Sequence, residues 1–258
     1  MDQSDQSRGV VQQLLRLEAY RTLLTKFYRL AITQHEPSVR LILLFASILK
    51  LQRMAGAIHL LAGETLAEEI RALSRTMAEV TINAAYLQDA EDEEVDRFQH
   101  FDTQSAFRLA NRLRPHTTTR VNPEEQKKIE AAADNARALT GRKDSDPSWS
   151  KRTLFQRAEY CDGITRLDLM VKLALTSYAY GHCAIHGTFD ALESFTSAVV
   201  SGEIQVSSDE EREEALFLAL FSANFTLSIM CFYVNSLLHL GAESAITDAG
   251  MLTPGDER

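Results

Sequence analysis

Hydrophobic residues recur at helical spacing along most of the chain, and short polar segments separate one such stretch from the next. Apolar positions three and four residues apart form one continuous stripe on a helix, which is the pattern of a helix packed on a core. Proline, glycine and capping residues mark where each stretch begins and ends. The pattern predicts helices over residues 8–33, 38–62, 65–87, 95–113, 123–139, 153–162, 165–186, 189–200 and 208–238.

Several of the expected helix starts rest on specific residues. Pro37 suits the first turn of a helix, because its φ is already helical and its missing N–H is not needed there. Thr65 with Glu68 has the spacing of a capping box, in which each side chain accepts the backbone N–H of the other residue. Thr165 with Asp168 has the same spacing before the helix 165–186.

The helices over 38–62 and 208–238 are the most apolar of the chain. The first is apolar nearly all round, so we expect it at the centre of the core. From Ala215 to Leu238 the second has no charged residue, which meets the length criterion for a membrane span. Its polar stripes and acidic flanks are instead typical of a soluble core helix, because membrane spans have basic cytoplasmic flanks. A membrane-associated protein, anchored by this helix, is the alternative.

Turn-forming residues are few: five prolines and eleven glycines in 258 residues are too few for a protein of many strands. The sequence therefore predicts an all-α fold. We expect a single large multi-helix bundle over residues 1–241, with the apolar C-terminal helix at its centre. The polar segment 140–150 is the place where a joint between subdomains is expected. Residues 242–258 are expected to form a loosely ordered tail.

Charge and cysteine content indicate the compartment and the partners. The net charge is −9, yet residues 8–53 contain eight basic and two acidic residues, a local charge of +6. Such a basic region on an acidic chain can meet an anionic partner or the protein's own acidic surface. Three cysteines without metal-ligand spacing, and an N-terminus that lacks an export signal, predict a cytoplasmic protein with free thiols.

The densest group of reactive side chains lies near the end of the predicted helix 165–186. Tyr178, His182 and His186 are four residues apart, so they follow one face of the helix and their polar ends can converge. A His pair at this spacing is able to hold a divalent metal, but the glutamate that zincins place after the first histidine is Cys183 here. We predict no metal and no cofactor. The cluster is either a site or part of the core packing.

Arg75 and Glu79 are candidate partners of that cluster. They are four residues apart in the helix 65–87, and Arg71 precedes Arg75 by the same interval. Buried charges are costly unless they are paired, so an inward-facing pair would use Glu79 to orient an imidazole and Arg75 to hold an anion. The alternative is a solvated ion pair within the helix. The acidic run 91–94 is interpreted as a solvated helix start rather than a metal site.

Two motifs in the middle of the chain carry a family resemblance. They are Arg71-Ala-Leu-Ser-Arg75-Thr-Met-Ala-Glu79 followed by Ala85-Tyr86-Leu87, and Trp149…Arg157-Ala158…Gly163…Tyr178…His186-Gly187. Over roughly residues 40–195 the chain resembles an uncharacterised bacterial family, the DUF5677 proteins. The resemblance implies a helical fold similar to HEPN-type bundles and a place in bacterial conflict or stress systems, with no established activity. That family usually has a serine at the position of His182, so the family pattern is matched by His186 and not by His182.

The expected function is a binding or regulatory one. We expect a cytosolic helical bundle that forms a homodimer and meets a protein partner, in bacterial stress response or phage defence. The alternative is a HEPN-like metal-independent ribonuclease, in which His186 is the general acid/base, Tyr178 or His182 handles a second proton, and Arg75 neutralises a phosphate. The overall acidic charge disfavours RNA as a partner, and no membrane contact is expected. Whether the chain is an enzyme stays open.

Overall fold

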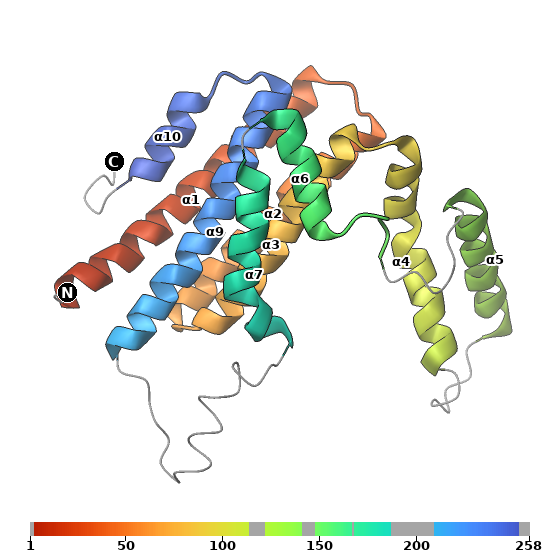
Figure 1. The fold of residues 1–258 in the computed structure, drawn as a ribbon, viewed down its shortest axis with the longest axis horizontal. Helices are drawn as coiled ribbons and strands as arrows, with labels where there is room; N and C mark the ends of the chain where they lie inside the picture. The colour runs from red at the N-terminus through yellow and green to blue at the C-terminus, as the bar shows by residue number, and fades with distance from the viewer. Residues whose placement is uncertain (1–2, 114–121, 141–147, 167, 187–208, 253–258) are drawn as a thin grey trace, which may run out of the picture. The chain divides into compact units, whose positions relative to one another are not determined.

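The computed structural model describes residues 3–113, 122–140, 148–166, 168–186 and 209–252. Within these ranges the regular elements are helices, which confirms the all-α prediction (Figure 1). They are α1 (Gln3–Gln34), α2 (Val39–Gly63), α3 (Ala67–Asp89), α4 (Asp92–Leu113), α5 (Pro123–Thr140), α6 (Leu154–Thr165), α7 (Leu169–His186), α9 (Asp209–Leu238) and α10 (Glu243–Met251). The helix predicted over 189–200 lies outside the described residues.

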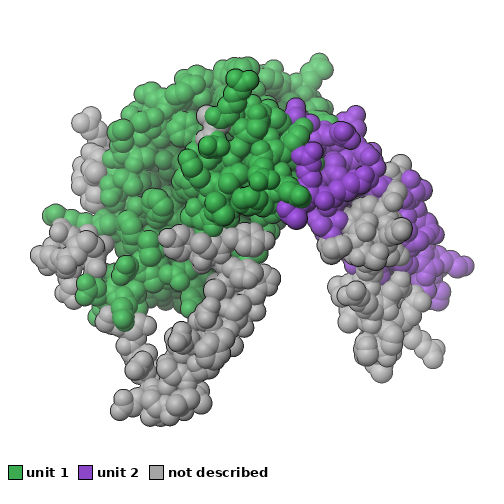
Figure 2. All heavy atoms as spheres, viewed as in Figure 1, with its two compact units in different colours: residues 1–86, 154–258 green, residues 87–153 purple. Residues whose placement is uncertain are grey.

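The chain forms two compact units, which Figure 2 shows in different colours. Unit 1 comprises residues 1–86 and 154–258, and unit 2 comprises residues 87–153. The sequence predicts one bundle with a joint at 140–150, and one unit boundary, after Thr153, falls beside that segment. The other boundary falls within α3, where the apolar pattern is uninterrupted and no break is predicted.

Helix α9 is the axis of unit 1. It contacts α1, α2, α7 and α10, and Figure 1 shows it between α1 and α7. The Asn224 amide nitrogen donates to Gln13 Oε1 at 2.8 Å, and Cys231 Sγ lies 3.9 Å from the Tyr20 carbonyl oxygen. Both pairs are separated by 211 residues, so α1 runs parallel to α9. The expected central position of the C-terminal apolar helix is thus found within unit 1.

Helix α3 also runs parallel to α9. Near the start of both helices, Ser74 Oγ donates to the Ala219 carbonyl oxygen at 3.4 Å. Three to four turns further along both helices, the Tyr233 hydroxyl donates to the Ala85 carbonyl oxygen at 3.2 Å. The apolar positions that predict this helix are the ones that face α9 and its neighbours, because Ile70, Met77 and Ala84 are all buried in the same core.

Helix α2 is less central than the sequence predicts. It runs antiparallel to α1, since Gln52 Nε2 donates to Thr25 Oγ1 at 2.9 Å while Phe45, earlier in α2, meets Tyr28, later in α1, with ring centroids 5.7 Å apart. One face is buried, but Ile42 and Leu60 on another face are 52% and 74% exposed. Its buried residues are Leu44, Phe45, Ile48, Leu51, Ala55, Ile58 and Ala62. The expected place at the centre of the core is wrong, because the composition of a helix shows which side chains it can bury but not how many neighbouring helices cover it.

At two helix starts, a residue has another role than the sequence predicts. Helix α2 begins where expected, but Pro37 precedes it and is not in its first turn. Ser38 is the N-cap, because its backbone is extended and its Oγ accepts the N–H of Leu41 at 3.2 Å. At the next helix, Thr65 has φ +56° and α3 begins only at Ala67. The predicted capping box is therefore wrong, because a residue in the left-handed region does not have the extended backbone of an N-cap.

The C-terminal segment, expected to be a loosely ordered tail, contains the helix α10. Its Ile246 and Ala249 are buried in the core of unit 1. Asn235 at the end of α9 holds its start, because Asn235 Nδ2 donates to Glu243 Oε1 at 2.9 Å and Asn235 Oδ1 accepts the N–H of Ala242 at 2.8 Å. The backbone N–H of Glu243 and the Asn235 amide both favour the ionised carboxylate, which lowers the pKa of Glu243.

Unit 2 is built from α4 and α5. Arg97 is buried and joins the two helices, with Nη1 donating to Glu94 Oε1 at 2.8 Å and Nε donating to the Thr140 carbonyl oxygen at 3.3 Å. The acidic run that precedes it does begin α4, as predicted. Glu94 is nevertheless only 8% exposed and paired with arginine, so that part of the run is not solvated.

We expect Gly250 to be needed where α10 crosses Tyr20. A Cβ at position 250 would stand 2.8 Å from Tyr20 Oη, and Tyr20 is only 6% exposed. Gly250→Ala should therefore lower the free energy of unfolding by about 1 kcal/mol, measured by chemical denaturation. The control is Gly163→Ala in α6, where the added Cβ meets nothing within 4 Å and should stabilise the helix by up to about 1 kcal/mol. Equal effects of the two substitutions would contradict the close approach.

Candidate functional site

Arg71, Arg75 and Glu79 lie one turn apart on α3. Arg75 is 6% exposed, and its Nε lies 3.5 Å from Glu79 Oε1. The Glu79 side chain is 42% exposed. The structure thus brings two of the predicted residues together as an ion pair within one helix. Arg75 lies in the interior and the Glu79 carboxylate reaches the surface. The pair is therefore intrahelical, with only Glu79 substantially exposed to solvent.

Tyr178, His182 and His186 lie on α7, which is helical through His186. The four-residue spacing therefore places the three positions along one face of a real helix, as predicted. Their side chains lie outside the described residues. The prediction that Arg75 and Glu79 face these three side chains stays a prediction.

Asp162, at the end of α6, holds the start of α7. Its Oδ1 accepts the N–H groups of Leu169 at 3.0 Å and Met170 at 2.9 Å, and its Oδ2 accepts that of Val171 at 2.8 Å. Asp168, the predicted capping residue, is exposed and has φ +50°. The predicted capping box is wrong, because the carboxylate of the preceding helix already binds the free N–H groups. A negative charge at a helix N-terminus is also favoured by the helix dipole.

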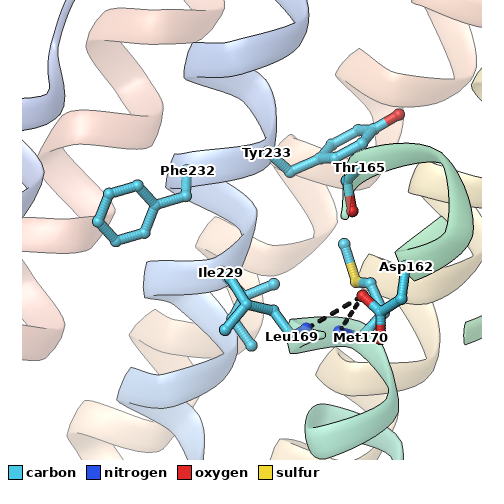
Figure 3. A pocket seen from close by; sticks show the side chains of 7 residues that line it. All are labelled: Asp162, Thr165, Leu169, Met170, Ile229, Phe232 and Tyr233. Atoms are coloured by element: carbon cyan, nitrogen blue, oxygen red, sulfur yellow. Dashed lines mark hydrogen bonds between the residues drawn. The ribbon is translucent and has the colours of Figure 1, made fainter. Parts of the chain in front are cut away.

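A small hollow lies beside this cap, between α6, α7 and α9 (Figure 3). Its walls are formed by Asp162, Thr165, Leu169, Met170, Ile229, Phe232 and Tyr233. It has room for about one water molecule. Thr165 Oγ1 donates to the Cys161 carbonyl oxygen at 3.0 Å, and Asp162 is occupied by α7. The polar groups of these walls therefore serve the packing of the helices, and a substrate-sized molecule does not fit.

No role for α6 is predicted from the sequence. Asp162 is its main structural residue, and Arg157 one turn earlier is 6% exposed. The Tyr160 ring meets Tyr86 of α3 edge to face, with ring centroids 5.4 Å apart. In the sequence, Asp162 is recognisable only as an acidic residue at the end of one predicted helix and a few residues before the next. This pattern is a weaker predictor of an N-cap than the capping-box spacing of Thr165 with Asp168.

Cysteine and metal-ligand chemistry add little to this part of the chain. Among the described residues, no group of three or more His, Cys, Asp and Glu side chains could hold a metal ion. Cys161 and Cys231 are buried free thiols, and burial raises the pKa of the Cys231 thiol. The side chain of Cys183 lies outside the described residues.

Residues 41–204 match DUF5677, a family of unknown function. The chain belongs to this family. The DUF5677 segment begins in α2 and runs past α7, so Arg75, Glu79, Tyr178 and His186 lie within it, whereas α1, α9 and α10 lie outside. No curated protein and no solved structure matches the chain.

We expect Asp162 to stabilise the start of α7 in this DUF5677 chain. Asp162→Asn replaces one acceptor oxygen by an NH2 group that cannot accept the N–H groups of α7, so the free energy of unfolding should fall by about 1–2 kcal/mol. Asp168→Asn is the matched control, because asparagine also tolerates positive φ, and its effect should stay within about 0.5 kcal/mol. Denaturation curves of the two variants measure this difference, and a larger loss for Asp168→Asn would overturn the assignment.

Proposed function

We propose that this DUF5677 protein is a binding or regulatory protein of the bacterial cytosol, which docks a partner through α2 and acts in stress response or phage defence. The supporting observation is the large aliphatic side chains that α2 holds in solvent. Ile42 is 52% exposed, Leu49 41% and Leu60 74%. Large apolar side chains that are exposed together on one side of a helix are a feature of interaction sites in soluble proteins.

The core of unit 1 does not depend on these side chains. On the opposite face of α2, Leu44, Ile48 and Leu51 are fully buried. Covering Ile42, Leu49 and Leu60 would gain up to about 1.5–3 kcal/mol for each side chain, which is a favourable contribution to docking. We also propose a homodimer, which light scattering of the purified protein tests.

The double variant Ile42→Gln with Leu60→Gln should abolish the protein's effect in cells. Growth of producing cells with and without phage challenge is the readout. Because both side chains lie outside the core, the free energy of unfolding should change by no more than about 1 kcal/mol. A matched double variant, Ile164→Gln with Met251→Gln, changes side chains that are 50% and 66% exposed on α6 and α10. If both double variants retain full effect, or both lose it, α2 is not the docking surface.

A metal-independent ribonuclease similar to HEPN proteins is the second candidate function. The supporting observation is that the Arg75–Glu79 ion pair and His186 all belong to the family segment. Arginine suits the neutralisation of a phosphate in a reacting RNA, because its charge does not titrate at cellular pH. In this candidate, His186 transfers the proton and Arg75 binds the phosphate.

If this second function holds, His186→Gln should abolish RNA cleavage in producing cells, because glutamine keeps the approximate size but cannot transfer a proton at neutral pH. His182→Gln is the matched control one turn away on α7, at a position that departs from the family pattern, and should retain most of the activity. RNA integrity on gels is the measurement. Loss of cleavage with His182→Gln alone would show that the wrong histidine is assigned, and intact RNA in wild-type cells would exclude the ribonuclease.

A further inference from the structure

The outer face of α2 is a row of exposed residues along one side of the helix. We define it by Val39, Ile42, Ala46, Leu49, Arg53 and Leu60, all of which are exposed. These positions are separated by three, four and seven residues, so they follow one side of the helix. From Val39 to Leu60 the row is about 32 Å long at 1.5 Å per residue. Its apolar side chains therefore reach the same side of the molecule together.

Helix α2 differs from the other very apolar helix in how much of it the protein covers. Among the described residues, α2 and α9 are the two helices that are long and apolar enough to cross a membrane by length and composition. In their most apolar windows, 61% of α9 is buried inside the protein but only 33% of α2. The inner face of α2 is held by the core, so this helix can lie on an apolar phase but is not free to cross one.

The charge around the outer face is positive. Helix α2 contains Arg40, Lys50 and Arg53 and no acidic residue along its 25 residues. Lys50 and Arg53 are exposed. Arg21 of the neighbouring α1, whose Nη1 lies 3.5 Å from the position of a Cβ on Gly56, is paired with Glu18 at 2.8 Å, so the positive charge of this face comes from α2 itself. An occupant of this face must therefore offer both apolar contact and negative charge.

The positive charge of the outer face distinguishes between its three possible binding partners, which are a second copy of the chain, a nucleic acid and a lipid surface. A second copy docked through the same face would bring like charges together without an acidic residue of α2 to offset them, which is destabilising. Nucleic acid supplies negative charge but makes little use of exposed Val, Ile and Leu side chains. The surface of a bilayer with anionic lipids offers negative headgroups above an apolar layer, and it is flat enough to meet the whole row.

We propose that the outer face of α2 binds an anionic lipid surface, with Ile42, Leu49 and Leu60 entering the headgroup boundary and Lys50 and Arg53 contacting lipid phosphates. This inference rests on the docking role proposed above and names its partner. It departs from the sequence expectation of no membrane contact. The protein is peripheral: it is soluble without detergent, and a carbonate wash releases it from membranes.

Vesicle flotation with the purified full chain tests the proposal. The protein should float with phosphatidylcholine vesicles that contain phosphatidylglycerol, and not with pure phosphatidylcholine, and the bound fraction should fall as salt is added. Lys50→Glu with Arg53→Glu should weaken partitioning at least about tenfold. Ile42→Gln with Leu60→Gln should weaken it by about tenfold or more.

Two controls separate the outer face from general effects. Lys127→Glu with Lys128→Glu makes the same change of charge on α5, where both lysines are exposed, and Ile164→Gln with Met251→Gln makes the same loss of apolar surface elsewhere in unit 1. Both controls should float like the wild type. Circular dichroism melts of every variant confirm that the fold is retained.

Three results would overturn the lipid proposal. The first is no flotation with anionic vesicles, and the second is flotation that the α2 variants leave unchanged. The third is light scattering in which the α2 variants convert a dimer into a monomer, which makes a second copy the occupant. If vesicles do not bind but the Ile42 and Leu60 variant still loses its effect in cells, the docking function stands and the lipid partner is wrong. If vesicles bind but the Ile42 and Leu60 variant keeps its effect in cells, the lipid partner stands and the docking function is wrong.

Discussion

The helices of unit 1 are positioned by the need to enclose α9, which has no charged side chain between Ala215 and Leu238. Apolar side chains on several sides of one helix require neighbours on several sides. The few polar groups of α9 then determine how those neighbours are aligned along it. Asn224 binds Gln13 of α1, and Asn235 binds the start of α10. Because an unpaired buried amide costs about 1–3 kcal/mol, these bonds select one alignment among the many that apolar packing alone would allow.

The need to enclose α9 also explains why the DUF5677 segment shares its core with helices outside that segment. The DUF5677 match begins after α1 and ends before α9. Within it, Ile70, Met77 and Ala84 of α3 are buried in a core that α1 and α9 complete. In this chain, helices outside the match therefore cover the helix that holds Arg75 and Glu79. Substitutions in α1 or α9 can change the position of that ion pair without touching it.

Features that depend on residues close together in the sequence could be predicted, whereas features that depend on contacts formed after folding could not. Periodicity is local, so it predicted the class and most of the described helices, and the lack of charge in α9 predicted its central place. Capping depends on which donor and acceptor meet after folding. Thr65 and Thr165 had the right spacing, yet the backbone at Thr65 is left-handed and Asp162 replaces the Thr165 pair. The exposed face of α2 could not be predicted, because composition does not reveal which neighbours a helix lacks.

At the candidate site, the limit was different. The spacing of Arg75 and Glu79 correctly predicted an ion pair, because residues four apart are neighbours on the surface of a helix. It could not predict that the arginine is buried and the carboxylate half exposed, since that depends on how α3 is turned toward its neighbours. The position of this pair relative to His186 on α7 depends on contacts between residues far apart in the sequence. The periodicity of a single helix does not predict such contacts.

The parallel pairing of α1 with α9 has a consequence for synthesis of the chain. Partners such as Gln13 and Asn224 are 211 residues apart, so α1 waits for its partner for about 10–40 s at common translation rates. During that interval the apolar faces of α1 and α2 are available to chaperones and to other nascent chains. Folding of unit 1 is therefore completed after most of the chain has left the ribosome, and a chain truncated before α9 should be an aggregation hazard rather than a smaller stable protein.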